Sequence, residues 1–430
     1  MTLSTLYPMK SYIPLLLVLL LLVSCLRVPI TNRRQVNLIG EQQLIEMAEL
    51  QYAAFKDSVI VLPLSNTQAK RVKRIGDRIK KSVVDFLTEK GHNVRLWRRN
   101  FRALENLKNS NSISLTDYKG TRDIKISIIT DSIETAMKGT ELVILPLPCD
   151  THTALAPQLA PHWVDEQVGY LTPGSFGGYI YAKAAIKAGN KANISFGETG
   201  TLPYLARKQN ENSVRISVYA TRLPTGIYPL RNSDHAFSMI KKAYPAAEKI
   251  TDLLDGALMN AGPIIHPPLI MMNAGPLEHF DVWDIHNEGT QPSIRSVTNA
   301  LDEERISLRK TLGYKEPHFP LKNHYDDTLE EWMYGNSSHA KLTDSGDWRE
   351  NINLHTHRYM REDTALGLTF FCSLGRWVNH PMPISEGLLA IASEITGDKL
   401  YESGRSLESL GLADLDVDEM KSMLEIGITA

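Results

Sequence analysis

The sequence has few cysteines and almost no net charge, and both shortages exclude whole classes of protein. Three cysteines occur in 430 residues, at Cys25, Cys149 and Cys372, and no two have the spacing of a metal-binding pair. Three are too few for a disulfide framework, so Cys149 and Cys372 are interpreted as small buried apolar residues. The formal net charge is -2, whereas a dedicated nucleic-acid binder needs a basic surface. We therefore expect no nucleic-acid partner.

An apolar run lies close to the N-terminus. Ile13–Val23 follows Lys10 and leads into Ser24 and Cys25. The run is too short to cross a bilayer comfortably but suits a secretory signal. Residues 22–25 resemble a bacterial lipobox, in which the exposed cysteine takes a lipid. We expect residues 1–25 to be a lipoprotein signal, with Cys25 lipidated and anchored to the membrane; a retained membrane anchor is the alternative.

Residues 26–90 have a different character. Val28–Leu38, Glu41–Met47 and Val72–Ile79 resemble the opening of envelope zinc metalloproteases. That family needs a His-Glu-x-x-His helix, in which two histidines bind the metal and the glutamate activates water. No such motif occurs in the chain, so protease activity is not expected. Apolar positions recur here at helical spacing, which predicts helices.

From about Gly91 the pattern changes to strands that alternate with helices. Strand patterns lie at residues 93–97, 124–129, 142–147 and 167–171, and helical patterns at 103–108 and 132–138. This alternation predicts a parallel, doubly wound sheet. Ligands bind such sheets at the carboxyl ends of the strands. Farther along, helical periodicity predicts helices at residues 234–242, 249–259, 294–312, 366–374 and 384–395.

Several motifs in this part resemble opine dehydrogenases of the octopine/nopaline family. In chain order they are Gly91–Asn100, Leu171–Gly178, Glu198–Tyr204 with Arg207, Asn260 with Ile265–Pro268, Leu301–Arg305, and Arg358–Asp363. Each would be weak alone, but their shared order makes the resemblance specific from about residue 91 to 400. It implies an α/β Rossmann-like parallel sheet at 91–225 and a mainly α-helical substrate domain at 226–430.

The glycine-rich turn that opens such a sheet has no counterpart. Glycine is needed there because the backbone must approach the cofactor pyrophosphate at a helix N-terminus. No such turn precedes Gly91, and no glycine lies between Val59 and Ile75. The first strand and glycine loop are therefore interpreted as lost or substituted. Our hypothesis is that Ser58–Leu62 and the basic stretch Asn66–Leu87 take the place of the first strand and helix.

The residues that follow the strand predicted at 93–97 indicate which cofactor is bound, because this strand corresponds to the second strand of a dinucleotide-binding sheet. An acidic residue there binds the ribose hydroxyls, whereas arginine accommodates a 2′-phosphate. Arg98 and Arg99 stand at this place, without an acid. We expect NADP rather than NAD if a cofactor binds; two solvated arginines beside a turn are the alternative. Within the cofactor cleft, the resemblance adds His152, Pro173 and Gly174 as candidate contacts.

The reaction implied by the resemblance joins a 2-oxo acid to an amino acid. The amine adds to the oxo group, water leaves, and hydride reduces the imine. His266 is the candidate acid/base because an imidazole titrates near neutrality, and Asp363 is its expected carboxylate partner. Arg358 is the expected carboxylate clamp, since its guanidinium binds in a bidentate manner. Asn260 is expected to hold substrate or a cofactor amide.

Each of these residues could instead have a purely structural role. His266 lies among apolar residues and prolines, where a histidine is usually a satisfied core residue, and Arg358 with Asp363 could be a helix-surface salt bridge. The carboxylates near His286 read as a solvated loop rather than a metal site. Two functions stay open: an opine dehydrogenase, and a non-catalytic chimeric envelope lipoprotein. The signal indicates the envelope, whereas the enzyme family indicates the cytoplasm.

Overall fold

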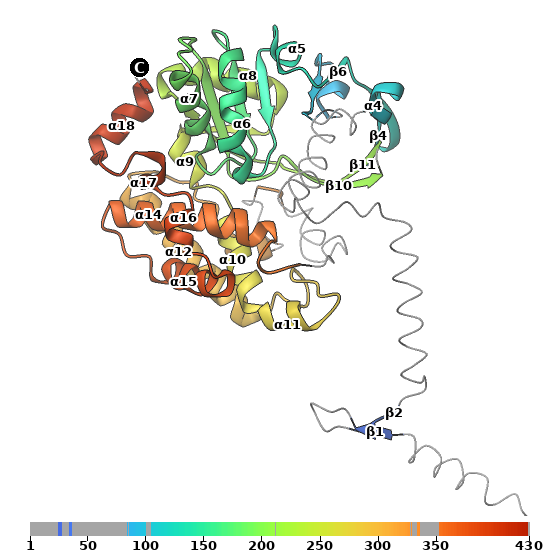
Figure 1. Cartoon of the computed structure of the whole chain (residues 1–430), viewed down its shortest axis with the longest axis vertical. Coiled ribbons are helices and arrows are strands. Elements are labelled where there is room, and N and C mark those ends of the chain that lie inside the picture. The colour runs from blue at the N-terminus through green and yellow to red at the C-terminus, as the bar shows by residue number, and fades with distance from the viewer. Residues whose placement is uncertain are drawn as a thin grey trace, which may run out of the picture. The chain divides into compact units, whose positions relative to one another are not determined.

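The computed structural model describes residues 84, 86–99, 105–210, 212–326, 328, 333–335 and 352–428, together with two short strands near the N-terminus (Figure 1). The chain divides into two units, Met1–Thr67 and Gln68–Ala430. In the first unit, β1 (Cys25–Arg27) pairs antiparallel with β2 (Arg34–Val36). The apolar run before Cys25 and most of residues 26–90 lie outside the described residues. Within the described part, no helix combines the length and apolarity needed to cross a membrane.

A five-stranded sheet forms the centre of the second unit. Its strands, in spatial order, are β13 (Ala247–Asp252), β12 (Leu223–Tyr228), β9 (Ser195–Thr199), β8 (Val168–Leu171) and β7 (Leu142–Leu145). The strands β7, β8 and β9 are parallel, whereas β12 runs antiparallel to β9. Every residue of β8 and β9 is buried because α7 (Gly177–Lys187) packs on one face and α8 (Ser233–Ala243) on the other.

A separate parallel pair, β3 (Arg95–Trp97) and β6 (Ile128–Thr130), completes the pattern. A doubly wound dinucleotide sheet has the strand order 3-2-1-4-5-6. The order β6-β3 corresponds to strands 3-2, and β7-β8-β9 corresponds to strands 4-5-6. Among the described residues, no strand stands at position 1, between β3 and β7. The fold is therefore a Rossmann-like sheet with its first position undescribed; the candidate Ser58–Leu62 lies outside the described residues.

A second sheet connects the two halves of this pattern. Its order is β10 (Tyr204–Asn210), β11 (Ser213–Tyr219), β4 (Ser112–Asp117) and β5 (Gly120–Lys125). The hairpin β4–β5 is inserted between β3 and β6, and the hairpin β10–β11 between β9 and β12. One apolar core contains Leu96 of β3, Leu115 of β4, Tyr170 of β8 and Val214 of β11. The second sheet thus shares an apolar core with β3 and β8, which stand on either side of position 1 in the strand order of the main sheet.

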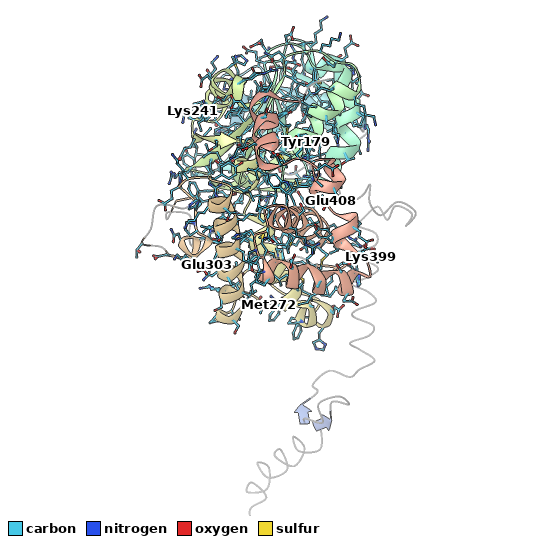
Figure 2. The ribbon with its side chains drawn as sticks, turned by 90° about the vertical axis from the view of Figure 1, so that its left-hand side faces the viewer. Tyr179, Lys241, Met272, Glu303, Lys399 and Glu408 are labelled. Atoms are coloured by element: carbon cyan, nitrogen blue, oxygen red, sulfur yellow. The ribbon has the colours of Figure 1, made fainter. Side chains whose placement is uncertain are left out.

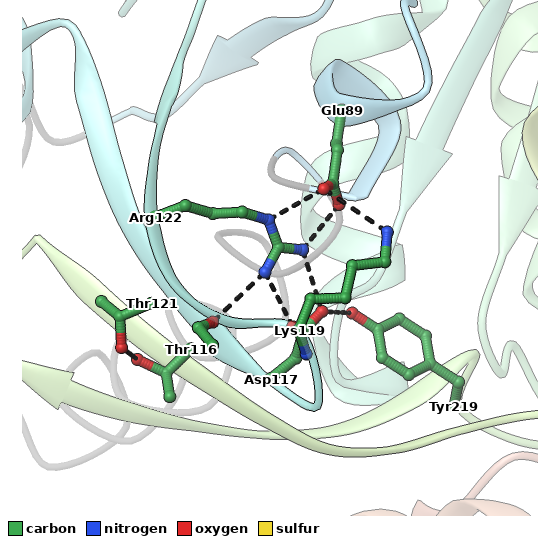
Figure 3. A network of polar contacts seen from close by, with 8 residues as sticks. Glu89, Thr116, Asp117, Lys119, Thr121, Arg122 and Tyr219 are labelled. Carbon is green, nitrogen blue, oxygen red and sulfur yellow. Dashed lines mark hydrogen bonds and ion pairs between the residues drawn. The ribbon is translucent and has the colours of Figure 1, made fainter.

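An ion-pair network fastens the β4–β5 hairpin (Figure 3). The guanidinium of Arg122 binds Asp117 at 2.7 Å and Glu89 at 2.7 Å. The hydroxyl of Tyr219 donates to Asp117 Oδ2 at 2.7 Å. These contacts hold the pKa of Asp117 well below its usual range, chiefly through the hydrogen bond from Arg122. The network joins the segment that carries Glu89 to both hairpins.

The rest of the second unit is helical. The helices that shape the site are α9 (Leu253–Ala257), α10 (Gly262–Met272), α12 (Pro292–Thr311), the π-helix η8 (Tyr359–Leu368), α14 (Thr369–Trp377) and α15 (Pro383–Thr396). Figure 2 shows Tyr179 on the sheet half, and Met272 and Glu303 on the helical half. The helices predicted at 234–242, 294–312 and 384–395 are confirmed as α8, α12 and α15.

Two local predictions need correction. The helix predicted at 249–259 is wrong over its first half, because Ala247–Asp252 forms β13 and pairs with β12. Only Leu253–Ala257 is helical there, and the Asp252 side chain caps it by accepting from the amide of Asp255. The single strand predicted at 124–129 is two strands, since β5 ends at Lys125 and β6 begins at Ile128. Between them the amide of Ile126 donates to the carbonyl of Asn111.

Candidate active site

His266 and Asp363 meet although 97 residues separate them in the chain. His266 lies on α10 and Asp363 on the π-helix η8, and Nδ1 of the imidazole is 2.8 Å from Oδ2 of the carboxylate. Only 13% of the histidine side chain and 6% of the aspartate side chain are exposed. The two side chains predicted to form an acid/base pair are therefore in contact inside the protein.

Small residues allow the two helices to come this close. A Cβ added to Gly262 would lie 2.2 Å from Asp363 Oδ1, and one added to Gly367 would lie 2.2 Å from Pro263 Cγ. Any larger residue at either place would push η8 away from α10. The π-helical turn also matters, because it shifts the side chains of η8 away from the register of an α-helix, a feature common at functional sites.

Burial sets the protonation of this pair. It lowers the pKa of His266 well below the usual value, and the nearby charge of Arg358 acts in the same direction. Burial raises the pKa of Asp363 to about 6, which Arg358 partly opposes. At neutral pH the imidazole is therefore uncharged and the carboxylate is ionised. The carboxylate fixes the proton on Nδ1, which leaves a lone pair on Nε2.

Arg358 stands directly before η8, and its side chain is 27% exposed. Its Nε lies 3.9 Å from Oε2 of Glu362, one turn later. The other oxygen of Glu362 accepts a hydrogen bond from the amide of Cys149 at 2.9 Å. Arg358 thus approaches the carboxylate of Glu362, and its guanidinium is also close enough to lower the pKa of both members of the dyad.

Asn260 connects the helical half to the loop after β8. Its Oδ1 accepts from the amide of Gly262 at 3.0 Å, which helps to begin α10. Its Nδ2 donates to the hydroxyl of Ser175 at 2.8 Å. Ser175 follows Pro173 and Gly174, so this contact ties the glycine turn to the helix that carries His266.

Arg405 is a functional candidate that the sequence did not reveal. It is 4% exposed and donates to three backbone carbonyls, those of Cys149, Gly174 and Ser175, at 2.8, 2.9 and 2.6 Å. Cys149 follows β7 and Gly174 follows β8, so one guanidinium holds both strand-end loops. No local pattern marks this arginine, because its acceptors lie more than 200 residues away in sequence.

A carboxylate on the neighbouring strand β9 also holds the loop after β8. Glu198 on β9 is fully buried, and its carboxylate accepts from the amides of Phe176 and Gly177 at 2.9 and 2.7 Å. These amides belong to the first turn of α7, whose orphan donors need a partner. Burial raises the pKa of Glu198 to about 7, although both hydrogen bonds favour the charged form.

The remaining predicted cofactor contacts lie at strand ends. Arg98 and Arg99 follow β3 directly; Arg98 is half-buried and Arg99 is exposed. His152 begins α6 (His152–Leu159) after β7 and is fully buried, with its ring 5.5 Å from that of Tyr181. Burial lowers the pKa of His152 to about 3, so the ring is neutral. The structure thus puts these residues on the carboxyl side of the sheet.

A second imidazole lies near the dyad. His286 and His266 have ring centroids 5.9 Å apart, and Tyr359 contacts both rings. Sequence reasoning gave His286 little weight because its partners could not be inferred from nearby residues. Only the tertiary fold brings it to Tyr359, 73 residues later in the chain.

Comparisons with known proteins find similar chains and folds. Residues 249–396 match the family model described as NAD/NADP octopine/nopaline dehydrogenase, alpha-helical domain. An opine dehydrogenase of Arthrobacter sp. (strain 1C) is 24% identical over 345 residues, covering 79% of this chain and 94% of that protein. Protein ocs of Agrobacterium tumefaciens (strain Ach5) is 23% identical over 293 residues, covering 66% of this chain and 78% of that protein.

Solved structures share the fold. An octopine dehydrogenase with NADH and pyruvate has a TM-score of 0.61 at 15% identity, covering 80% of this chain and 95% of that one. A yersinopine dehydrogenase with bound NADP+ has a TM-score of 0.56 at 14% identity, covering 80% and 96%. The helical part of the chain thus matches this family model, the curated relatives are similar to most of its length, and the solved structures share its fold.

Proposed function

We propose that this chain is an oxidoreductase of the opine dehydrogenase type, which condenses a 2-oxo acid with an amino acid and reduces the resulting imine with NADPH or NADH. The observation that carries the proposal is the buried contact between His266 and Asp363, with Arg358 close by. An acid/base dyad beside a guanidinium suits substrates that carry an amine and a carboxylate. The similarity to opine dehydrogenases supports the same reaction class.

In the first step of the proposed reaction, the neutral imidazole acts as a base. Nε2 of His266 removes a proton from the substrate ammonium group, and the free amine adds to the oxo carbon. The imidazolium is stabilised by the ionised Asp363 at 2.8 Å. It then returns the proton to the hydroxyl of the carbinolamine, which leaves as water. The same ring therefore accepts and donates one proton, and the imine is ready for reduction.

Arg358 is proposed to bind a substrate carboxylate through its planar guanidinium. Its side chain is 27% exposed, and its Nε lies 3.9 Å from Oε2 of Glu362. A substrate carboxylate could accept two parallel hydrogen bonds from such a guanidinium. Asn260 is proposed to act on substrate or a cofactor amide through the loop that it already binds.

The strand-end residues fit a nicotinamide dinucleotide. The Thr172 hydroxyl, at the carboxyl end of β8, is buried and has no hydrogen-bond partner among the residues that the structure describes. This hydroxyl, beside Pro173 and Gly174, could form a hydrogen bond with the carboxamide of the nicotinamide. We propose that these residues and His152 line the nicotinamide side, and that Arg98 and Arg99 contact the ribose 2′-phosphate of NADP. When bound, the reduced nicotinamide supplies the hydride.

A non-catalytic envelope lipoprotein is the second candidate. The observation that favours it is that no glycine-rich turn precedes Gly91 in the sequence. The metalloprotease-like segment would then be fused to a dehydrogenase fold, and a lipid at Cys25 would anchor the chain. Titration of the full chain with NADPH, followed by fluorescence, separates the two candidates. Lack of saturation at millimolar cofactor would favour the lipoprotein.

The activity itself is tested with the purified full chain. We expect oxidation of NADPH that requires both pyruvate and an amino acid, and that is lost in His266→Ala. His235→Ala is the matched control, since this histidine lies on α8 with a 35% exposed side chain and pairs with Glu166. Unchanged turnover in His266→Ala would remove this residue from the mechanism. Cofactor binding without oxidation for any substrate pair would contradict the proposed reaction.

A further inference from the structure

The aromatic ring of Tyr359 lies flat on the imidazole of His266. The two ring centroids are 3.6 Å apart and the planes differ by 12°. Tyr359 is 4% exposed and is the first residue of η8, so the backbone that carries Asp363 also carries this ring. One helix thus contacts His266 at two places, at Nδ1 through a carboxylate and on the ring face through a phenol.

The phenol is held in turn by a second histidine. The Tyr359 hydroxyl is 3.0 Å from Nε2 of His286. Burial lowers the pKa of His286 well below the usual value, and the charges of Arg207 and Arg358 act in the same direction. A neutral imidazole offers one nitrogen as an acceptor, so the phenol can donate to it. This hydrogen bond fixes the rotation of the Tyr359 ring.

Resting on the proposed function, we propose that Tyr359 is a positioning residue for His266 and that His286 acts on the reaction through the Tyr359 hydroxyl. The carboxylate of Asp363 restrains one atom of the imidazole, which leaves rotation about the Nδ1–Oδ2 contact free. The stacked ring removes that freedom. Together they fix the direction of Nε2, which must face the reacting carbon.

The stack also favours the charged form of His266 during turnover. A cation over an aromatic face is attracted by the ring quadrupole, and donation of the hydroxyl proton to His286 makes the ring richer in electrons. The imidazolium needs such support because it is buried and the charge of Arg358 is close by. Among the residues that the structure describes, the titratable and charged groups around the two imidazoles are Arg207 on β10, His324 on η6 (Leu321–Tyr325), and His357, Arg358 and Asp363 on or beside η8.

Three variants of the full chain separate the roles. Tyr359→Leu removes the stack, and we expect kcat to fall about 10- to 100-fold with little change in substrate KM. The acidic limb of the pH profile should move down by about one pH unit, because the imidazolium loses its aromatic face. Tyr359→Phe keeps the stack and loses the hydroxyl, so we expect a fall of about 3- to 10-fold. His286→Gln should match Tyr359→Phe.

The double variant Tyr359→Phe/His286→Gln decides whether the two residues form one unit. If His286 acts through the hydroxyl, the double variant loses no more than either single one. Multiplied losses would overturn that part of the proposal. Tyr118→Phe is the matched control, because this tyrosine is 79% exposed. An unchanged pH profile in Tyr359→Leu would overturn the role of the stack.

One measurement does not depend on turnover. In protein labelled at the histidine ring nitrogens, the His266 signal is identified by its loss in His266→Gln, and its pH titration is followed by NMR. We expect the midpoint to fall in Tyr359→Leu and to stay in Tyr118→Phe. If the midpoint moves but no pair of substrates is turned over, the inference stands and the proposed function fails. If turnover is observed and the midpoint stays, the inference fails alone.

Discussion

Replacement of Asp363 by asparagine changes the centre of the site with almost no change in shape. The variant loses the charge that faces the imidazolium as His266 takes a proton. For two unit charges about 4 Å apart at an effective dielectric constant of about 20, that interaction is about 4 kcal/mol. This energy corresponds to a factor of about 1,000 in rate. Asparagine can also donate to Nδ1, which moves the imidazole proton to Nε2 and removes the base.

We therefore expect kcat to fall by about 100- to 10,000-fold in Asp363→Asn, measured by single-turnover oxidation of NADPH. Binding of NADPH should stay within about twofold, because Asp363 contacts His266 rather than a strand-end loop. The melting temperature should not fall at pH 8. Burial raises the pKa of Asp363 to about 6, so the ionised form destabilises the fold above that pH, and the neutral amide avoids this cost.

Asp398→Asn is the matched control. Asp398 forms an ion pair with Arg361, also on η8, but its side chain is 45% exposed and such pairs contribute little. A kcat for Asp363→Asn within about threefold of the wild type would refute the reasoning. In the wild-type enzyme, activity should also decline as the pH falls through about 6, where the coupled pair of His266 and Asp363 takes up a proton.

Two further predictions concern stability. In Arg309→Met, the fully buried guanidinium is lost and Asp255 keeps an unpaired buried charge, so urea unfolding should show a loss of about 3–5 kcal/mol. Arg376→Met, which breaks a half-exposed pair with Glu386, should cost less than about 1 kcal/mol; equal losses would contradict this. The raised pKa of Glu198, about 7, means that wild-type stability falls as the pH rises from about 4.5 to 7. Glu198→Gln should flatten that slope, and an unchanged slope would assign it to other groups.

The alternation of strands and helices was sufficient to predict the parallel sheet, because strand periodicity is a local property. The helix predicted at 249–259 shows where this information ends. Ile250, Leu253 and Leu254 have helical spacing, yet the first of them lies in a strand because β12 offers a hydrogen-bonding edge. That edge is a tertiary feature, which a window of about ten residues cannot contain.

For a similar reason, the sequence predicted some residues of the site and missed others. His266 and Asp363 were paired through the family resemblance, and neither the prolines that follow His266 nor the π-helical turn that carries Asp363 indicated their contact. Pro267 and Pro268 would normally argue against a helix, but α10 continues through both. Arg405 and Tyr359 were missed because each acts on groups that the fold alone brings near.

The three carbonyls held by Arg405 have a consequence for how this protein can be divided. Arg405 lies near the end of the chain but holds two loops of the sheet half. No single position in the sequence therefore separates the sheet half from the helical half. A fragment that ends before residue 404 would keep every strand of the sheet and still lack the anchor of two of its loops. The halves are thus interdependent, and neither is a self-sufficient module that could be transplanted alone.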